Sequence, residues 1–196
     1  MGLYSLNRGG VENEDPVSET STYRAEIVSR LRSATEDLQW IVRGVGRSAG
    51  AYTLSPQEWS IHEQVSHLRD MEQEVYLPLL RWATVPEMLD PRDYNRAAWH
   101  EMRYNAEEPL EGIVQDIVRI RDEELAIFRE VTDTVWRQYR TDTRWGPLTC
   151  EWIAELMYRH VLDHMQTIMA LQQDLHLEAL RPQAAMAGLV GGAKRG

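Results

Sequence analysis

The chain has 196 residues, of which 43% are hydrophobic, and a formal net charge of −10 from 21 basic and 31 acidic residues. This length and apolar content fit one globular domain with a substantial core. The acidic balance argues against a protein that binds a nucleic-acid backbone or an anionic membrane.

Cys150 is the only cysteine, which excludes an intrachain disulfide and a thiolate metal cluster and fits a reducing compartment. It lies beside a predicted helix start, where a thiol can be activated, but the pattern favours a small apolar core residue over a nucleophile. No signal segment is evident, and no apolar run approaches the roughly 18 residues of a membrane helix. The sequence therefore predicts a cytoplasmic protein.

The first 19 residues mix glycine, acids and a proline without periodicity, and we expect a tail or a surface arm. A first helix is predicted to follow N-cap candidates between Thr20 and Thr22 and to end near Gly44 and Gly46. Its inward face is formed by apolar residues at helical spacing, namely Tyr23, Ile27, Leu31, Leu38, Ile41, Val42 and Val45.

A second helix is predicted to begin at Ser60, because Ser60 followed by Glu63 is a capping box. His67 lies at the edge of its apolar stripe, where it can face a cleft instead of the packed centre. His62 falls on another side of the helix, and we expect it to be exposed to solvent. The stripe itself consists of Ile61, Val65, Leu68, Val75 and Leu79.

The aromatic-rich segment 93–105 is predicted to be a short helix or an ordered crossover, and its His100 could act as a proton shuttle. A third long helix is predicted over 109–138. Glu124 interrupts its inward face, and a buried carboxylate is costly unless it is paired. Either Glu124 turns to solvent or a positive group pairs with it, and we expect solvent. The functional alternative is that this carboxylate supports one of the histidines.

The segment 141–149 is predicted to be a connector, with a turn at Gly146-Pro147, and Thr149 to cap a fourth long helix. Neither strand alternation nor an internal repeat is evident, so the sequence predicts an all-α four-helix bundle with a long crossover between helices 2 and 3. The expected organisation is a tail over 1–19, the bundle over 20–180 and a frayed tail over 181–196.

The fourth helix carries two histidines, His160 and His164, inside an apolar stripe of helical period. Four residues advance a helix by about one turn and about 6 Å, so both imidazoles can reach one metal ion. Two core histidines that make ordinary hydrogen bonds would give the same pattern, and a third ligand from elsewhere would be needed to favour metal.

The chain resembles the DinB-like family of small metal-binding four-helix bundles. The resemblance rests on the order of the elements and on two stretches, WSIHEQVSHL at 59–68 and RHVLDHMQTI at 159–168, and it extends from about Tyr23 to Leu175. It implies a metal triad of one histidine from the second helix and two from the last, which in this chain are His67, His160 and His164.

Three neutral imidazoles with one open position suit zinc, with nickel, iron and cobalt as alternatives. Such a metal can lower the pKa of a water or bind a thiol as thiolate. The resemblance implies an enzyme in which a metal-activated water, or a low-molecular-weight thiol such as bacillithiol or mycothiol, attacks a small electrophilic substrate. No general base can be assigned, and the carboxylates nearest to His67 in sequence are Glu63, Asp70 and Glu74.

Two other functions fit the same sequence. A metal-binding stress-response protein without turnover needs the same three ligands, and a fourth protein ligand closing the site would favour it. A helical bundle with core histidines would bind no metal. The expected partner is a small-molecule substrate, with neither nucleic acid nor membrane, and the resemblance allows a homodimer as well as a monomer.

Overall fold

The computed structural model describes residues 16–88, 94–95, 98–142 and 146–192, and the side chains of these residues from Thr20 to Ala179 with the exception of Asp142. In chain order the elements are α1 (Pro16–Val42), α2 (Arg47–Gly50), α3 (Ile61–Met71), the π-helical turn η1 (Glu72–Tyr76), α4 (Leu77–Thr84), α5 (Trp99–Met102), α6 (Leu110–Glu130), α7 (Asp133–Arg137), β1 (Arg140–Asp142), β2 (Gly146–Leu148) and α8 (Cys150–Gly192).

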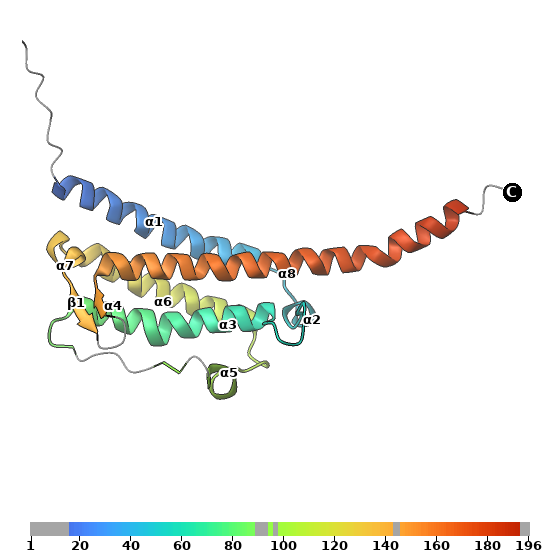
Figure 1. The fold of residues 1–196 in the computed structure, drawn as a ribbon, viewed down its shortest axis with the longest axis horizontal. Coiled ribbons are helices and arrows are strands. Elements are labelled where there is room, and N and C mark those ends of the chain that lie inside the picture. The colour runs from blue at the N-terminus through green and yellow to red at the C-terminus, as the bar shows by residue number, and fades with distance from the viewer. Residues whose placement is uncertain (1–15, 89–93, 96–97, 143–145, 193–196) are drawn as a thin grey trace, which may run out of the picture.

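Four long helical segments form a bundle, which confirms the predicted fold class (Figure 1). Elements α3, η1 and α4 follow one another without a break and make the second of these segments. Helix α1 packs on α6 and α8, and α3 also packs on α6 and α8, so the four segments close a ring. The long crossover from α4 to α6 carries α5 along the outside of the bundle (Figure 1).

The helix ends follow from local sequence. Ser60 and Glu63 form the predicted capping box, in which the Ser60 hydroxyl accepts from the Glu63 amide and the Glu63 carboxylate accepts from the Ser60 amide. The Trp152 amide donates to Thr149 Oγ1 at 3.0 Å, so Thr149 caps α8 as expected. Gly44 follows α1 with a φ of +76°, a conformation that L side chains rarely adopt.

Four boundaries differ from the sequence analysis. Helix α1 begins at Pro16, before the N-cap candidates between Thr20 and Thr22, and proline suits the first turn of a helix. The third helix ends at Glu130, not near Gln138, because Thr132 takes an extended conformation and caps the separate short helix α7 through the Val135 amide. The predicted connector forms an antiparallel hairpin, β1–β2, which the absence of strand alternation did not reveal. The backbone of α8 is helical to Gly192, beyond the expected end near Leu180, in a stretch rich in alanine.

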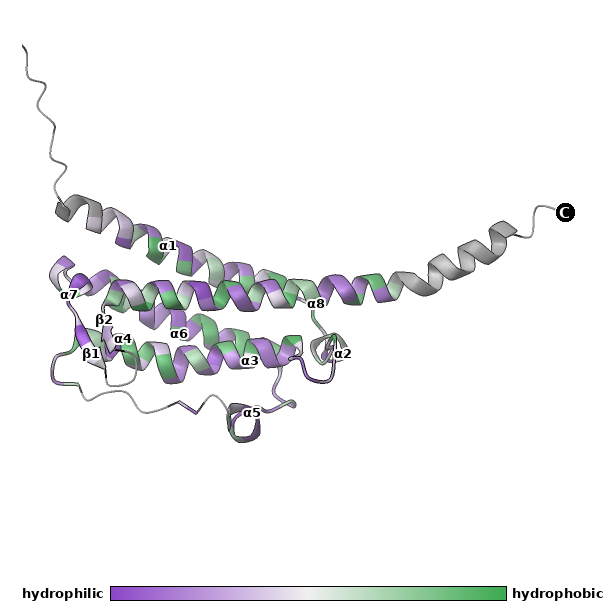
Figure 2. Cartoon of the chain, viewed as in Figure 1, coloured by the Kyte–Doolittle hydropathy of each residue, from purple (hydrophilic) through white to green (hydrophobic). Residues whose placement is uncertain are grey.

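The buried apolar side chains form two clusters, one at each end of the bundle. Hydrophobic residues alternate with hydrophilic ones along the bundle helices (Figure 2). The first cluster contains Leu31, Met71, Leu125, Phe128 and Met157, among others. The second contains Ala34, Leu38, Leu68, Ile117 and Val161, among others. Between them, at the middle of the helices, lie the buried polar residues Thr35, His67, Glu72, Arg121 and Glu124, which we call the polar layer.

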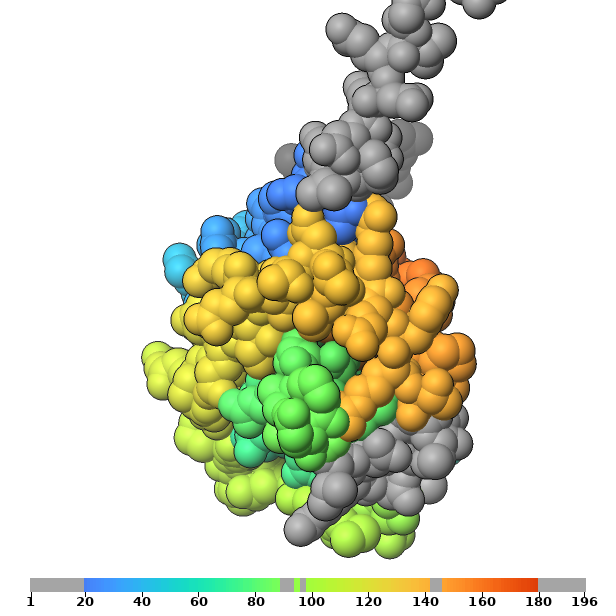
Figure 3. Space-filling model, turned by 90° about the vertical axis from the view of Figure 1, so that its left-hand side faces the viewer, coloured from blue at the N-terminus to red at the C-terminus, as the bar shows by residue number. Residues whose placement is uncertain are grey.

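The end of the bundle near α7 is closed by packed side chains (Figure 3). The Trp136 ring contacts Phe128 edge to face, with ring centroids 5.6 Å apart, and both are fully buried. The Arg140 guanidinium lies over the Trp82 ring and donates to the Val85 carbonyl oxygen at 2.7 Å, which ties the hairpin to the end of α4. Across the described residues, every helix is too short or too polar to traverse a lipid bilayer.

Candidate metal centre

The structure brings His67, His160 and His164 together, although His67 is more than 90 residues from the other two. One ring nitrogen of each lies within 4.8 Å of one ring nitrogen of both others. The contact between α3 and α8 produces this convergence, since His67 comes from α3 and the pair from α8. Within the described part of the chain, no further His, Cys, Asp or Glu joins the cluster.

Aromatic rings surround His67, which is fully buried, whereas His160 and His164 are partly exposed. The His67 ring lies 4.9 Å from Trp59 and 5.1 Å from Trp99, measured between ring centroids. Trp99 comes from the crossover helix α5, so the crossover lies against the histidines as the architecture suggested. Its indole Nε1 donates to Asp70 Oδ2 at 2.7 Å, which fixes this wall of the site.

The hydrogen bonds of the α8 histidines suit a metal ion. His164 Nδ1 contacts the Gln64 side-chain oxygen, which can only accept, so Nδ1 carries the proton and the Nε2 lone pair is directed elsewhere. That Nε2 lies 3.1 Å from His160 Nε2. Two imidazole nitrogens on one tetrahedral zinc ion, each about 2.05 Å from it, would lie about 3.3 Å apart. The donor set therefore fits a bound divalent ion.

The three carboxylates considered as general bases are engaged elsewhere. Burial alone would raise the pKa of Glu63, but hydrogen bonds from Ser60 and His100 outweigh this effect and lower it. Asp70 accepts from Trp99 and also pairs with Arg69. Glu74 forms an ion pair with Arg103 at 2.9 Å.

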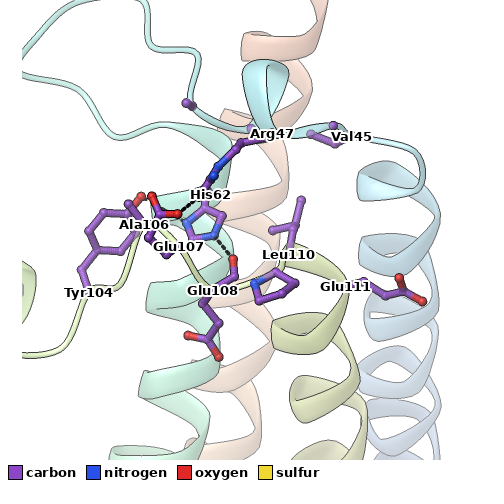
Figure 4. Close-up of a pocket in the computed structure, with 13 residues that line it drawn as sticks. Val45, Arg47, His62, Tyr104, Ala106, Glu107, Glu108, Leu110 and Glu111 are labelled. Atoms are coloured by element: carbon purple, nitrogen blue, oxygen red, sulfur yellow. Dashed lines mark hydrogen bonds and ion pairs between the residues drawn. The ribbon is translucent and has the colours of Figure 1, made fainter.

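The expectation that His62 is exposed was wrong. The residue is 9% exposed, its Nε2 lies 2.8 Å from the Glu108 carbonyl oxygen and its Nδ1 lies 3.1 Å from the Tyr104 hydroxyl. These partners are 46 and 42 residues away in sequence, so only the tertiary fold shows them. His62 lines a cavity of about 580 Å³ at the end of the bundle, and the Arg47–Glu107 ion pair lies at the same cavity (Figure 4).

His100 is about half exposed, and its Nε2 lies 2.7 Å from Glu63 Oε1. Its ring is 6.1 Å from that of Trp99, so it stands at the rim of the aromatic wall and not in the histidine cluster. The role of a proton shuttle stays a prediction.

The expectation that Glu124 faces solvent was also wrong. Glu124 is 0% exposed and its Oε2 lies 3.0 Å from Arg121 Nη1, one turn earlier on α6. Arg121 also binds Glu72 Oε1 at 2.6 Å. A positive partner therefore makes burial of Glu124 tolerable.

Cys150 behaves as a core residue. It is 0% exposed, and burial raises the pKa of its thiol to about 11, so the reactive thiolate is suppressed at neutral pH.

Two supporting residues were missed at the level of sequence. Gln64 lies three residues before His67 and therefore on the same face of α3, a spacing that could have revealed it. Tyr76 contacts His160 edge to face, with ring centroids 5.5 Å apart. Regular helical spacing does not place Tyr76 near this site, because the π-helical turn intervenes.

This fold and this histidine cluster define a small helical bundle of the DinB type, and comparison with known proteins agrees. The family model of the DinB superfamily matches residues 20–168, so the chain belongs to this superfamily. Comparison with curated proteins gave no match.

Two solved structures, both from Bacillus subtilis, share the fold. YfiT, described as a probable metal-dependent hydrolase with an unusual four-helix bundle topology, is 17% identical, with a TM-score of 0.70 over 90% of this chain and 95% of YfiT. A DinB-like protein, YjoA, is 13% identical, with a TM-score of 0.56 over 77% of this chain and 92% of that protein.

Proposed function

We propose that the protein is a divalent-metal-dependent enzyme in which a metal-activated water or small thiol attacks a small electrophilic substrate. The single observation that carries the proposal is the convergence of three imidazoles from two helices, with ring nitrogens within 4.8 Å of one another. The description of YfiT as a probable metal-dependent hydrolase supports the same class of reaction.

The three histidines would each offer one ring nitrogen, and zinc is the ion that best suits three neutral imidazoles and an open position. A closed structural zinc site has four protein ligands, and the cluster of described residues has three. This difference favours an enzyme over a metal-binding protein without turnover. When bound, the ion would bring the pKa of a water or thiol toward neutrality.

The surrounding residues orient the ligands and exclude water. Gln64 holds the proton of His164 on Nδ1, so that Nε2 stays available. Trp59 and Trp99 shield His67, and Asp70 anchors Trp99. A small substrate would therefore approach from the side of His160 and His164, which are partly exposed.

The first test is elemental analysis of protein purified without chelator, comparing wild type with His160→Ala. We expect wild type to hold about one ion per chain and the variant to lose most of it, because two imidazoles bind far more weakly than three. His176→Ala is the matched control, since His176 is an exposed histidine on the same helix. Equal metal content in wild type and His160→Ala would remove the site.

The second test separates turnover from mere binding. The metal-loaded protein is offered a panel of activated esters and alkyl halides, with and without a low-molecular-weight thiol. We expect hydrolysis or thiol transfer that His160→Ala lacks and His176→Ala retains. Full metal loading with no turnover on any substrate class would favour the non-catalytic alternative.

A further inference from the structure

A second polar cluster lies in the polar layer and has no part in the proposed reaction. Arg121 on α6 binds Glu72 at 2.6 Å and Glu124 at 3.0 Å, and its Nε donates to Thr35 Oγ1 on α1 at 3.2 Å. Arg121, Glu72 and Glu124, which we call the buried triad, are 2%, 1% and 0% exposed. Together with Thr35, the triad therefore links three segments of the bundle, α1, η1 and α6, through buried groups.

Stability alone is a poor explanation for such a cluster. Removing charges from water costs several kcal/mol per ion, and replacing a buried ionic triad by apolar residues is often neutral or stabilising. The best-attested use of buried ionic groups is to select one structure over its alternatives. For this triad the structure in question is the π-helical turn η1, which begins at Glu72.

The two carboxyl groups of the triad share one guanidinium. Burial and the negative charge of Glu72 raise the pKa of Glu124 well above its ordinary value, which favours its neutral form. The groups that face Glu124 are Glu72 of η1, and Arg121 and Glu123 of its own helix.

Glu72 is the first residue of the π-helical turn η1, and this turn changes which face of the helix carries Tyr76. In an uninterrupted α-helix the nine steps from His67 to Tyr76 would rotate the side chain by about 900°, or about two and a half turns. Tyr76 would then lie on the face opposite His67. The extra residue of a π-turn reduces the offset to roughly 80°. The turn thereby brings Tyr76 to the side of the bundle that carries His67.

Tyr76 lies between the histidine cluster and the buried triad. Its ring contacts His160 edge to face at 5.5 Å, and it is only 6% exposed. Tyr76 also ends the same π-helical turn that Glu72 begins. Burial alone would lower the pKa of Arg121, but Glu72, Glu124 and Tyr76 outweigh this effect and raise it. A path therefore runs from the triad through η1 and Tyr76 to His160.

We propose that the buried triad positions the metal centre: it holds η1 in its π-helical form, and Tyr76 then fixes the orientation of the His160 imidazole. This inference rests on the proposed function, because it concerns the same three histidines. It makes Tyr76, Glu72 and Arg121 positioning residues, none of which needs to touch metal or substrate. Outer partners of metal-binding histidines typically change metal affinity by about 10- to 100-fold.

The test loads Co²⁺ into the purified protein and records its dissociation constant and its visible absorption spectrum, which reports ligand geometry. The variants are Tyr76→Leu, Tyr76→Phe, Glu72→Gln and the double variant Glu72→Gln/Tyr76→Leu. Glu123→Gln is the matched control, because Glu123 undergoes the same chemical change at a partly exposed position on α6. Circular dichroism verifies that each variant is folded.

We expect Tyr76→Leu and Glu72→Gln each to weaken Co²⁺ binding by about tenfold and to shift the spectrum. Tyr76→Phe keeps the ring and should stay within about twofold of wild type, as should Glu123→Gln. Since the triad acts through Tyr76, the double variant should bind no more weakly than Tyr76→Leu alone. Wild-type affinity and spectrum in Glu72→Gln, or full additivity in the double variant, would overturn the inference.

Two further results are informative. If wild type takes up no Co²⁺, the proposed function fails and this inference fails with it. If Glu72→Gln does not fold, Thr35→Val replaces it, because this change removes the α1 hydroxyl that accepts from Arg121 and donates to the Leu31 carbonyl oxygen of its own helix. Thr35→Val should then weaken Co²⁺ binding by about threefold in wild type and leave Tyr76→Leu unchanged, and an equal effect in both backgrounds would overturn the inference.

Discussion

At the scale of single residues, the proposed metal centre depends on which ring nitrogen of each histidine carries its proton. Gln64 determines this for His164, because an amide oxygen can accept from Nδ1–H but cannot donate. His67 has a different support, a wall of tryptophan rings whose outer member is held by Asp70. A hydrogen bond therefore orients His164, and packing against aromatic rings orients His67.

The role of Gln64 can be tested by Gln64→Leu, which keeps the volume and removes the acceptor. We expect the dissociation constant of the bound divalent ion to rise by about 10- to 100-fold, because the His164 tautomer is no longer fixed. Isothermal titration with Zn²⁺ measures the change. Gln64→Glu, which keeps an acceptor oxygen at the same place, should retain wild-type affinity, and equal weakening in both variants would argue against a role in tautomer selection.

Sequence reasoning at this scale identified residues that follow from helical spacing or from the resemblance, and it misjudged residues whose surroundings depend on packing. The pair His160 and His164 follows from helical spacing, and His67 follows from the resemblance to the DinB-like family. His62 was misjudged because Tyr104 and Glu108 lie beyond the crossover. Glu124 was misjudged although one partner, Arg121, lies a single turn away, because the burial of both depends on packing against α1 and η1.

At the scale of elements, the capping box of α3 sets the starting point from which all its functional side chains are counted. Ser60 satisfies the Glu63 amide, and Glu63 in turn satisfies the Ser60 amide and holds His100. The position of the cap places Gln64 and His67 one turn apart on one face. This cap and the Thr149 cap of α8 could be predicted from the sequence, because capping depends on neighbouring residues only.

We expect Ser60→Ala to lower the free energy of unfolding by about 1 kcal/mol, the usual cost of losing an N-cap hydroxyl. Urea denaturation followed by circular dichroism measures it. Ser33→Ala is the control, since Ser33 is exposed in the middle of α1, and it should change the free energy by less than about 0.5 kcal/mol. Equal effects of the two substitutions would contradict a capping role for Ser60.

The π-helical turn, like the hairpin β1–β2, is an element that the sequence did not reveal. Residues 72–76 carry no glycine and no proline, and their apolar spacing is compatible with an ordinary α-helix. The turn becomes intelligible only once Glu72 is seen to face Arg121 from another helix. Its contribution to the site is therefore a property of tertiary packing.

At the scale of the whole molecule, the buried triad links stability to pH. The pKa of Glu124 is raised in the folded state, so above its ordinary pKa of 4.5 the folded protein binds more protons than the unfolded chain. Stability from this group is complete below that pKa and is lost as pH rises toward the raised value. Glu124→Gln has no titrating group at this position. The free energy of unfolding of this variant, relative to that of wild type, should therefore increase as pH rises.

Urea denaturation at a series of pH values from about 5 to 8 tests this linkage. The expected result is a difference between Glu124→Gln and wild type that grows with pH, while Glu123→Gln follows wild type in parallel. Curves for Glu124→Gln and wild type that stay parallel across the range would show that Glu124 is ionised in the folded protein.

The overall architecture was predictable because amphipathic period, caps and one long crossover suffice to specify a four-helix bundle. The arrangement of its interior was not, since it depends on which polar groups meet across helices. Four different helices contribute polar residues to the middle of the bundle, namely Thr35, His67, Arg121 and His160.

The polar layer separates the two buried apolar clusters, and Tyr158 on α8 packs against both. We expect a change in side-chain volume near Phe128 to be absorbed mainly among the neighbours of Phe128, and a change near Ile117 among the neighbours of Ile117. The two ends of the molecule should then accept separate redesign, provided that the polar layer and Tyr158 are kept.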